Sequence, residues 1–169
     1  MACVIGLAGL SNSGKTTLIT KLTRILCSKG LRVGVIKHDA HGHYKEVENT
    51  DSSHFMDSGA SAVVLSGKVR VMRFEIPQIE PSLDQLVAEM PELDIILIEG
   101  YKKSYYPKIA VCRLPEQIDI LNKMNGELLA IVSGFSYIHE DRDVPVYGID
   151  DSLGVAELVG QIIKNTIDV

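Results

Sequence analysis

The sequence predicts an α/β fold: a mostly parallel sheet with helices on both faces and an added antiparallel hairpin. Short apolar runs typical of buried strands alternate along the chain with segments of helical periodicity. The run at 95–98 is apolar at every position, which is typical of a central strand that is covered on both sides. The length of 169 residues suits one domain, so we expect a single domain over 1–169.

The chain begins with the pattern of a strand, a helix and a second strand. Val4–Ala8 is a short apolar run, and Lys29-Gly30 supplies a helix stop before a second β-like run at 32–36. Between the two runs, apolar side chains recur on one helical face: Leu18, Ile19, Leu22, Ile25 and Leu26. The following segment, 40–58, is polar and irregular, with room for a short helix before Gly59.

The middle of the chain predicts a hairpin and then a short helix. β-like runs at 62–65 and 69–74 flank Ser66-Gly67-Lys68, and we expect this hairpin to add an antiparallel edge to the sheet. Ser82 and Gln85 have capping-box spacing, which predicts a helix over 83–90. Further strands are predicted at 95–98, 108–112 and 128–132. A closing amphipathic helix carries Val155, Leu158, Val159, Ile162 and Ile163.

Composition excludes several classes of protein. Hydrophobic residues make up 46% and charged residues 23%, which argues against disorder and collagen. The net charge of −5 without a long basic run disfavours nucleic acid as a partner. Three cysteines without a CxxC pair argue against a disulfide framework and fit a reducing, cytoplasmic location. No apolar stretch is long enough to span a membrane, and the apolar N-terminus lacks the basic region of a signal peptide.

The most specific motif is Gly9-Leu-Ser-Asn-Ser-Gly-Lys-Thr16, a full match to the phosphate-loop pattern G-x-x-x-x-G-K-[ST]. Glycines let backbone N–H groups turn toward an anion, and the following helix adds its positive end. Lys15 supplies a charge for the β- and γ-phosphates. A strand before the motif and a helix after it favour this interpretation over a chance loop and predict a P-loop NTPase-like fold. The predicted phosphate-binding residues are Gly9, Leu10, Ser11, Asn12, Ser13, Gly14, Lys15, Thr16 and Thr17.

Such a loop works with Mg²⁺, which needs a hydroxyl and a nearby carboxylate. Thr16 offers the hydroxyl. Glu99 and Asp39 both follow predicted strands, at the sheet edge where α/β proteins bind ligands. Glu99 is the stronger candidate, because Gly100 lets the backbone turn close to a ligand. The alternative for each carboxylate is a solvated strand end or a helix cap.

Histidines gather after the second strand, at His38, His41 and His43, with His54 further on. A transition-metal site is one interpretation. No cysteine lies nearby and no helical His-x-x-x-His pair fixes a geometry, so we favour an anion site to which Lys37 and His38 contribute. The role of the histidine cluster stays open.

A basic aromatic segment, 99–108, follows the predicted Mg²⁺-side strand and holds three lysines and three of the six tyrosines. One interpretation is a lid or docking surface for a second ligand or a partner protein, with Gly100, Tyr101 and Lys102 facing that ligand. The other is an exposed loop whose tyrosines pack on its own backbone.

Two features of regulatory GTPases are missing. Asn122-Lys123-Met124-Asn125 lacks the final Asp of a guanine-reading motif, and no Asp-x-x-Gly-Gln string positions an attacking water. The residues therefore leave the base open, predict slow hydrolysis, and assign no catalytic residue.

Four motifs in this order resemble the MobB proteins, the molybdopterin-guanine dinucleotide biosynthesis adapters. They are the loop 9–17, Lys37-His38-Asp39, Asp51 followed by Gly59-Ala60, and Glu99-Gly100-Tyr101-Lys102. The resemblance implies GTP binding, at most weak GTPase activity, a homodimer, and partnership with the guanylyltransferase MobA, which attaches GMP to molybdopterin. By position it implies that 9–17 carries the phosphates and that Thr16 with Glu99 or Asp39 carries Mg²⁺.

Two other functions compete with a GTP-binding adapter. A small-molecule kinase or ATP-dependent ligase would need an arginine-bearing lid, and none of the six arginines lies in a glycine-rich stretch. A pure interaction protein with a vestigial loop would not need Lys15, Thr16 and Glu99 intact.

Overall fold

The computed structural model describes residues 2–39, 49–136 and 144–167, which form two compact units. The first unit comprises 1–38 and 86–169, and the second comprises 39–85. The expectation of a single domain over 1–169 stays a prediction. Within the described residues, no helix combines the length and apolar character needed to cross a membrane.

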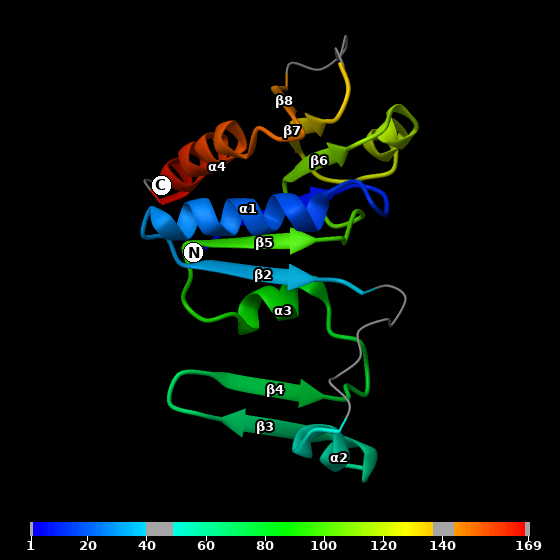
Figure 1. Cartoon of the computed structure of the whole chain (residues 1–169), viewed down its shortest axis with the longest axis vertical. Coiled ribbons are helices and arrows are strands. Elements are labelled where there is room, and N and C mark those ends of the chain that lie inside the picture. Colours follow the sequence, from blue (N-terminus) through cyan, green and yellow to red (C-terminus); the bar gives the residue numbers. More distant parts are fainter. Residues whose placement is uncertain (1, 40–48, 137–143, 168–169) are drawn as a thin grey trace. The chain divides into compact units, whose positions relative to one another are not determined.

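The first unit contains a six-stranded sheet in which every pairing is parallel (Figure 1). Its strand order is β2-β5-β1-β6-β7-β8. The bounds are β1 Cys3–Ala8, β2 Val33–Lys37, β5 Ile95–Glu99, β6 Lys108–Cys112, β7 Leu128–Ser133 and β8 Val146–Gly148. The predicted α/β class is therefore confirmed, and the central strand β1 lies between β5 and β6.

Side chains on the central strands alternate between two cores, as a sheet covered on both faces requires. Ile109 and Val111 of β6 join the larger core, which also holds the buried faces of α1 (Lys15–Ser28) and α4 (Ser152–Ile167). Ala110 and Cys112 join the smaller core with Ile120 and Leu121 of the 3-10 helix η1 (Pro115–Asn122). Figure 1 shows α1 and α4 side by side along the sheet.

The first helix follows its sequence pattern closely. α1 begins at Lys15, and the buried positions Leu18, Ile19, Leu22 and Leu26 are those of the predicted face. It ends at Ser28, and Gly30 adopts a φ of 84° just beyond it, where a residue without a Cβ is favoured. η1 and β8 were not predicted from the sequence, since three-residue strands and 3-10 turns carry little periodicity.

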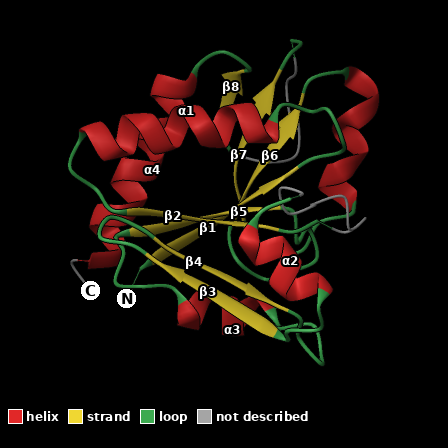
Figure 2. Cartoon of the chain, turned by 60° about the horizontal axis from the view of Figure 1, so that its bottom comes forward, coloured by secondary structure: helices red, strands yellow, loops and turns green. Residues whose placement is uncertain are grey.

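The second unit contains α2 (Asp51–Asp57) and the antiparallel hairpin of β3 (Ala62–Ser66) and β4 (Val71–Glu75), seen together in Figure 2. The hairpin is confirmed, but its expected position is corrected. β3 and β4 form a separate two-stranded sheet and, among the described residues, pair only with each other. Alternation of apolar and polar residues shows which side chains of a strand share a face, but it does not show which other strand lies beside it. The sequence therefore could not predict which sheet the hairpin joins.

The capping box of the third helix is present. Ser82 N donates to Gln85 Oε1 (2.8 Å) and Gln85 N donates to Ser82 Oγ (3.2 Å). These bonds satisfy backbone and side-chain groups at the start of α3 (Leu83–Glu89). The predicted helix over 83–90 is thus confirmed to within one residue.

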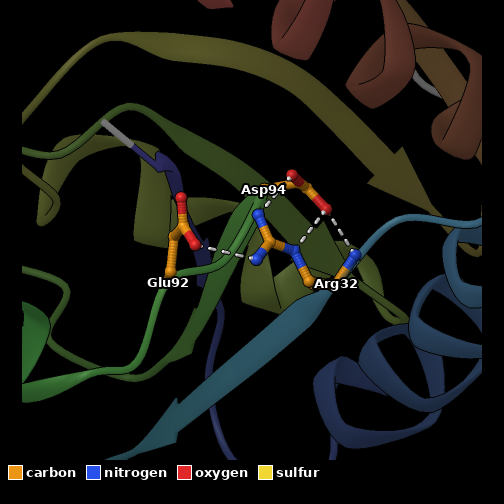
Figure 3. A network of polar contacts seen from close by, with 3 residues as sticks. All are labelled: Arg32, Glu92 and Asp94. Atoms are coloured by element: carbon orange, nitrogen blue, oxygen red, sulfur yellow. Dashed lines mark hydrogen bonds and ion pairs between the residues drawn. The ribbon is translucent and has the colours of Figure 1, made fainter.

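A polar network holds the starts of β2 and β5 together (Figure 3). The Arg32 backbone N donates to Asp94 Oδ2 (2.6 Å), and its guanidinium contacts Asp94 Oδ1 and Glu92 Oε2, each at 3.3 Å. The backbone hydrogen bond and the Arg32 charge lower the pKa of Asp94, and bonds to both carboxylates raise the pKa of Arg32. This network lies at the opposite end of these strands from the candidate site.

Candidate phosphate-binding site

The carboxyl ends of three neighbouring strands, β2, β5 and β1, carry the candidate site. Lys37 of β2 and Leu7 of β1 are both in register with Glu99 of β5, and the glycine-rich loop 9–14 joins β1 to α1. Because the sheet is parallel, these ends meet at one edge, which is where open α/β sheets bind ligands.

The glycine-rich loop has the backbone shape of an anion nest. Asn12 and Gly14 adopt positive φ values of 61° and 99°, and Ser13 N donates to Leu10 O (3.3 Å). Alternation of right- and left-handed residues turns N–H groups toward the concave side of such a loop. Gly14 is also the N-cap of α1 and has no side-chain cap. The predicted residues 9–14 therefore form one continuous loop, and Lys15, Thr16 and Thr17 form the first turn of α1.

Gly9 is required by close packing. A methyl group at this position would lie 2.4 Å from Ser13 Oγ and 2.5 Å from Val111 O, well inside van der Waals contact. Ser13 is fully buried, and its hydroxyl has no hydrogen-bond partner among the described residues. The side chain of Ser13 thus fills space beneath the loop, and only glycine leaves room for it.

Lys15 spans the loop. Its Nζ donates to Leu10 O at 2.7 Å, which holds the ammonium group over the loop. Partial burial lowers the pKa of Lys15, the Glu99 carboxylate opposes this shift, and the charges of Lys37 and Lys102 add to it. Three lysines and one carboxylate thus surround this position, an excess of positive charge that favours a bound anion.

Thr16 and Glu99 are joined directly, although they are 83 residues apart in the sequence. The Thr16 hydroxyl is 2.9 Å from Glu99 Oε1 and 3.0 Å from Oε2, and Lys37 Nζ lies 3.5 Å from Oε1. The carboxylate is only 12% exposed, whereas the Lys37 side chain is 56% exposed. A hydroxyl and a carboxylate oxygen this close are a suitable pair of ligands for Mg²⁺, which otherwise retains water and phosphate oxygens.

His38 and Tyr101 extend this edge of the site. Their rings are 4.5 Å apart and tilted by 32°, and His38 N donates to Glu99 O (3.0 Å). Gly100 has a φ of 97°, and a methyl group there would lie 3.2 Å from His38 Cβ. Lys37, His38, Gly100 and Tyr101 therefore lie together, and Lys102 is close enough to affect the pKa of Lys15.

Asp39, His41 and His43 are the remaining candidates from the sequence. Asp39 begins the second unit, so its role as a Mg²⁺ ligand stays a prediction. His41 and His43 lie outside the described residues. Across the described ranges, 2–39, 49–136 and 144–167, no three His, Cys, Asp or Glu side chains group as metal ligands would.

Side-chain and backbone hydrogen bonds from Lys108 and Asn125 fix the backbone of the basic aromatic segment. Lys108 is fully buried, and its Nζ donates to the carbonyl oxygens of Ser104 and Tyr106. Asn125 contributes two more bonds, from its N to Lys102 O (2.9 Å) and from its Nδ2 to Lys103 O (3.1 Å). Asn125, part of the incomplete guanine-reading string, therefore has a structural contact here. Tyr105 is 84% exposed, so this loop presents an aromatic side chain to solvent.

Sequence reasoning missed a second layer of contacts around the glycine-rich loop. Gln117 Nε2 donates to Ser11 O (3.4 Å), and a methyl group on Gly14 would lie 3.1 Å from Arg113 Nη2 and 3.7 Å from Ile149 Cδ1. Arg113 directly follows β6, so its strand-end position was the available signal. Gln117 lies in η1 and Ile149 directly follows β8, and neither segment carries a recognisable motif.

Comparison with known proteins identifies the family. The family model for MobB, described as molybdopterin guanine dinucleotide synthesis protein B, matches residues 4–134. The chain belongs to the MobB family. The matched range includes the glycine-rich loop, Glu99 and the basic aromatic segment.

MobB relatives match over most of the chain. The molybdopterin-guanine dinucleotide biosynthesis adapter protein of Haemophilus influenzae is 34% identical, over 78% of this chain and 75% of that protein. The protein of the same name from Escherichia coli is 31% identical, over 94% and 92%. These matches support an adapter role in molybdopterin guanine dinucleotide biosynthesis.

Solved MobB structures share the fold. A crystal structure of molybdopterin-guanine biosynthesis protein B has a TM-score of 0.76 at 27% identity, covering 95% of this chain and 99% of that chain. Bacillus subtilis MobB gives a TM-score of 0.75 at 25% identity, covering 95% and 97%. The P-loop NTPase-like fold expected from the loop motif is therefore confirmed.

Proposed function

We propose that this MobB protein binds Mg²⁺-GTP at the glycine-rich loop and assists a guanylyltransferase of the MobA type, which attaches GMP to molybdopterin. The observation that carries the proposal is the contact between Thr16 and Glu99, beside a loop whose Lys15 is already held across it. A phosphate loop, a hydroxyl and a buried carboxylate are the parts with which this fold class binds a nucleoside triphosphate and its metal ion.

Residues 9–17 bind the phosphates in this proposal, and Mg²⁺ binds between Thr16 and Glu99, with Asp39 as a further candidate ligand. The excess positive charge from Lys15, Lys37 and Lys102 favours a highly charged anion. The ring pair of His38 and Tyr101, together with Gly100 and Lys102, forms the side on which a second ligand or the partner approaches.

Hydrolysis by this protein alone is slow in the proposal. The site has the binding parts, but the sequence contains no Asp-x-x-Gly-Gln string that would position an attacking water. The protein then acts mainly by holding the nucleotide, with at most weak GTPase activity. A single-turnover rate of many per second for the isolated protein would contradict this part of the proposal.

A homodimer is also proposed, with the hairpin of the second unit as the contact. A two-stranded sheet is marginal by itself. Both outer edges of the hairpin lack a strand partner among the described residues, and Val64 and Val71 on one face are more than half exposed.

Sedimentation of the V64K/V71K variant tests this contact, and we expect the variant to be a monomer. Leu153→Lys, on the exposed side of α4, is the control and should leave the dimer intact.

Calorimetric titration of the purified protein with Mg²⁺-GTP and Mg²⁺-ATP tests nucleotide binding, with Lys15→Ala as the comparison. Loss of the charge-assisted contacts of Lys15, worth about 1.5–3 kcal/mol, lowers affinity roughly 10- to 150-fold. A preference for GTP that is lost in the variant supports the adapter function. An unchanged dissociation constant contradicts the assignment of the loop.

A preference for ATP would favour the alternative function instead, a small-molecule kinase or an ATP-dependent ligase on the same fold. The search would then turn to an acceptor substrate. Absence of binding to either nucleotide would favour an interaction protein with a vestigial loop.

A further inference from the structure

Arg113 is a cation placed against the start of α1. It follows Cys112, the last residue of β6, and its Nη2 would lie 3.1 Å from a methyl group on Gly14. Gly14 is the N-cap of α1, so the guanidinium lies beside the turn where the glycine-rich loop becomes the helix. β6 is the neighbour of β1, which leads into the loop.

Three contacts fix the backbone from which this side chain extends. Arg113 N donates to Gln117 Oε1 (2.8 Å), and Gly134 N donates to Cys112 O (2.8 Å). A methyl group on Gly134 would lie 2.3 Å from Arg113 O, so the two backbones are in close contact. Gln117 also donates to Ser11 O, which links the same anchor to the glycine-rich loop.

The electrostatics of this position favour an anion between Arg113 and the loop. Arg113 is exposed, and in the part of the chain that the structure describes no carboxylate pairs with its guanidinium. The N-terminus of a helix is the positive end of its dipole, and the first turn of α1 holds no acidic residue. Lys15 is the first residue of that helix and carries a further positive charge. A guanidinium held beside the positive end of a helix is unfavourable until a negative charge joins it.

We propose that Arg113 is a second phosphate-binding cation of the site and contacts the polyphosphate chain of the bound nucleotide. The inference rests on the proposed binding of a nucleoside triphosphate to the loop. A planar guanidinium matches two phosphate oxygens at once, which an ammonium group cannot do. Arg113 then contacts the phosphate chain from the end of β6, and Lys15 contacts it from the start of α1.

The test uses Arg113→Gln, with Arg24→Gln as the matched control and Arg113→Lys as the conservative variant. Arg24 is an exposed arginine of α1, so both glutamine variants lose the same charge. Calorimetry gives the dissociation constant for Mg²⁺-GTP at several salt concentrations. We expect Arg113→Gln to weaken binding about tenfold and to reduce its salt dependence, since one charge contact with phosphate is lost. Arg24→Gln should match the wild type, and Arg113→Lys should fall between the two.

Thermal unfolding distinguishes a role of Arg113 in nucleotide binding from a role in the stability of the fold. Without nucleotide, Arg113→Gln should unfold at the wild-type temperature or above it, because an unfavourable cation is removed. The stabilisation by GTP should be smaller than in the wild type. A lower unfolding temperature with an unchanged dissociation constant would overturn the proposal and make Arg113 a structural residue.

The Lys15→Ala variant distinguishes failure of the Arg113 proposal from failure of the proposed nucleotide binding. If Lys15→Ala weakens binding as expected and Arg113→Gln binds like the wild type, Arg113 is not a phosphate ligand and the proposed nucleotide site stands. If the wild type binds neither Mg²⁺-GTP nor Mg²⁺-ATP, the proposed function fails, and the role of Arg113 fails with it.

Discussion

The hydroxyl of Thr16 lies within 3.0 Å of both carboxylate oxygens of Glu99. Thr16 is in the first turn of α1, and Glu99 ends β5, which pairs with β1 just before the glycine-rich loop. Parallel pairing of β1 with β5 brings the two groups together, because their strands end at the same sheet edge. The same register adds Lys37 of β2, whose ammonium group lies 3.5 Å from Glu99 Oε1.

Removing the Thr16 hydroxyl should weaken metal-dependent binding. Thr16→Val keeps the shape of the side chain but loses one oxygen ligand for Mg²⁺. We expect the affinity for GTP in the presence of Mg²⁺ to fall about tenfold or more, a loss of about 1.4 kcal/mol or more. Titrations with and without Mg²⁺ measure this.

Thr20→Val is the control for that substitution. The Thr20 hydroxyl donates to Thr16 O within α1 (2.8 Å), away from the carboxylate. It should leave the Mg²⁺ dependence of binding unchanged. A Thr16→Val protein that retained the full Mg²⁺ dependence of the wild type would exclude this hydroxyl as a metal ligand.

Gly9→Ala should destabilise the fold as well as the loop. The added methyl group meets Ser13 Oγ and Val111 O at distances that neither group can accept without moving. Overpacking of this kind costs about 1–3 kcal/mol of unfolding free energy. Urea denaturation measures it, and we expect nucleotide binding to fall in the same variant.

Gly160→Ala is the matched glycine substitution with the opposite expected sign. Gly160 lies inside α4, and a methyl group there meets no neighbouring atom within 4 Å. Alanine favours a helix over glycine by about 0.5–1 kcal/mol, so this variant should be more stable than the wild type. Equal losses of stability for the two variants would show that the contacts of Gly9 are not the cause.

The Arg32–Asp94 network should make stability depend on pH in the acid range. Asp94 has a lower pKa in the folded protein than the value of about 3.9 expected when unfolded. Its contribution is therefore complete above the unfolded value and is lost as pH falls through the folded one. Asp94→Asn should be less stable than the wild type at pH 7, and the difference should shrink steadily below about pH 4.

Urea denaturation between pH 7 and pH 3 tests this prediction, with Asp57→Asn, an exposed carboxyl in α2, as the control. A stability difference for Asp94→Asn that stays constant across this range would mean that ionisation of Asp94 does not contribute.

Thiol reactivity should separate the three cysteines. Cys112 is fully buried, and burial raises its pKa to about 11, so about one molecule in a thousand carries the thiolate at pH 8. Burial also raises the pKa of Cys3, whereas Cys27 is exposed. A disulfide reagent such as DTNB should titrate one thiol in the native protein, lost in Cys27→Ser, and three in denaturant. Rapid reaction of two or more native thiols would contradict the buried positions.

Much of this architecture could be predicted from local sequence. The apolar face Leu18–Leu26 predicted α1, Ser82 with Gln85 predicted the start of α3, and continuous apolar runs predicted the central strands. These features depend on side-chain periodicity and capping, which act over a few residues. The loop motif likewise predicted a strand, a nest and a helix start in the right order. Gly14 adopts a positive φ that favours glycine, whereas Gly9 is required by packing against Ser13 and Val111 O.

Other features depend on which segments pair, and periodicity does not encode that. The sequence predicted the β3–β4 hairpin but not that it forms a separate sheet, and it gave no signal for η1 or β8. The sequence predicted Glu99 and Thr16 as separate candidates for binding Mg²⁺. The parallel register of β1 and β5 is what brings the Thr16 hydroxyl to the Glu99 carboxylate. In the sequence, Arg113 is one of six arginines, and no motif distinguishes it from the others. The tertiary structure alone brought its guanidinium to Gly14, because the contact requires β6 beside β1 and a backbone held by Gln117 and Gly134.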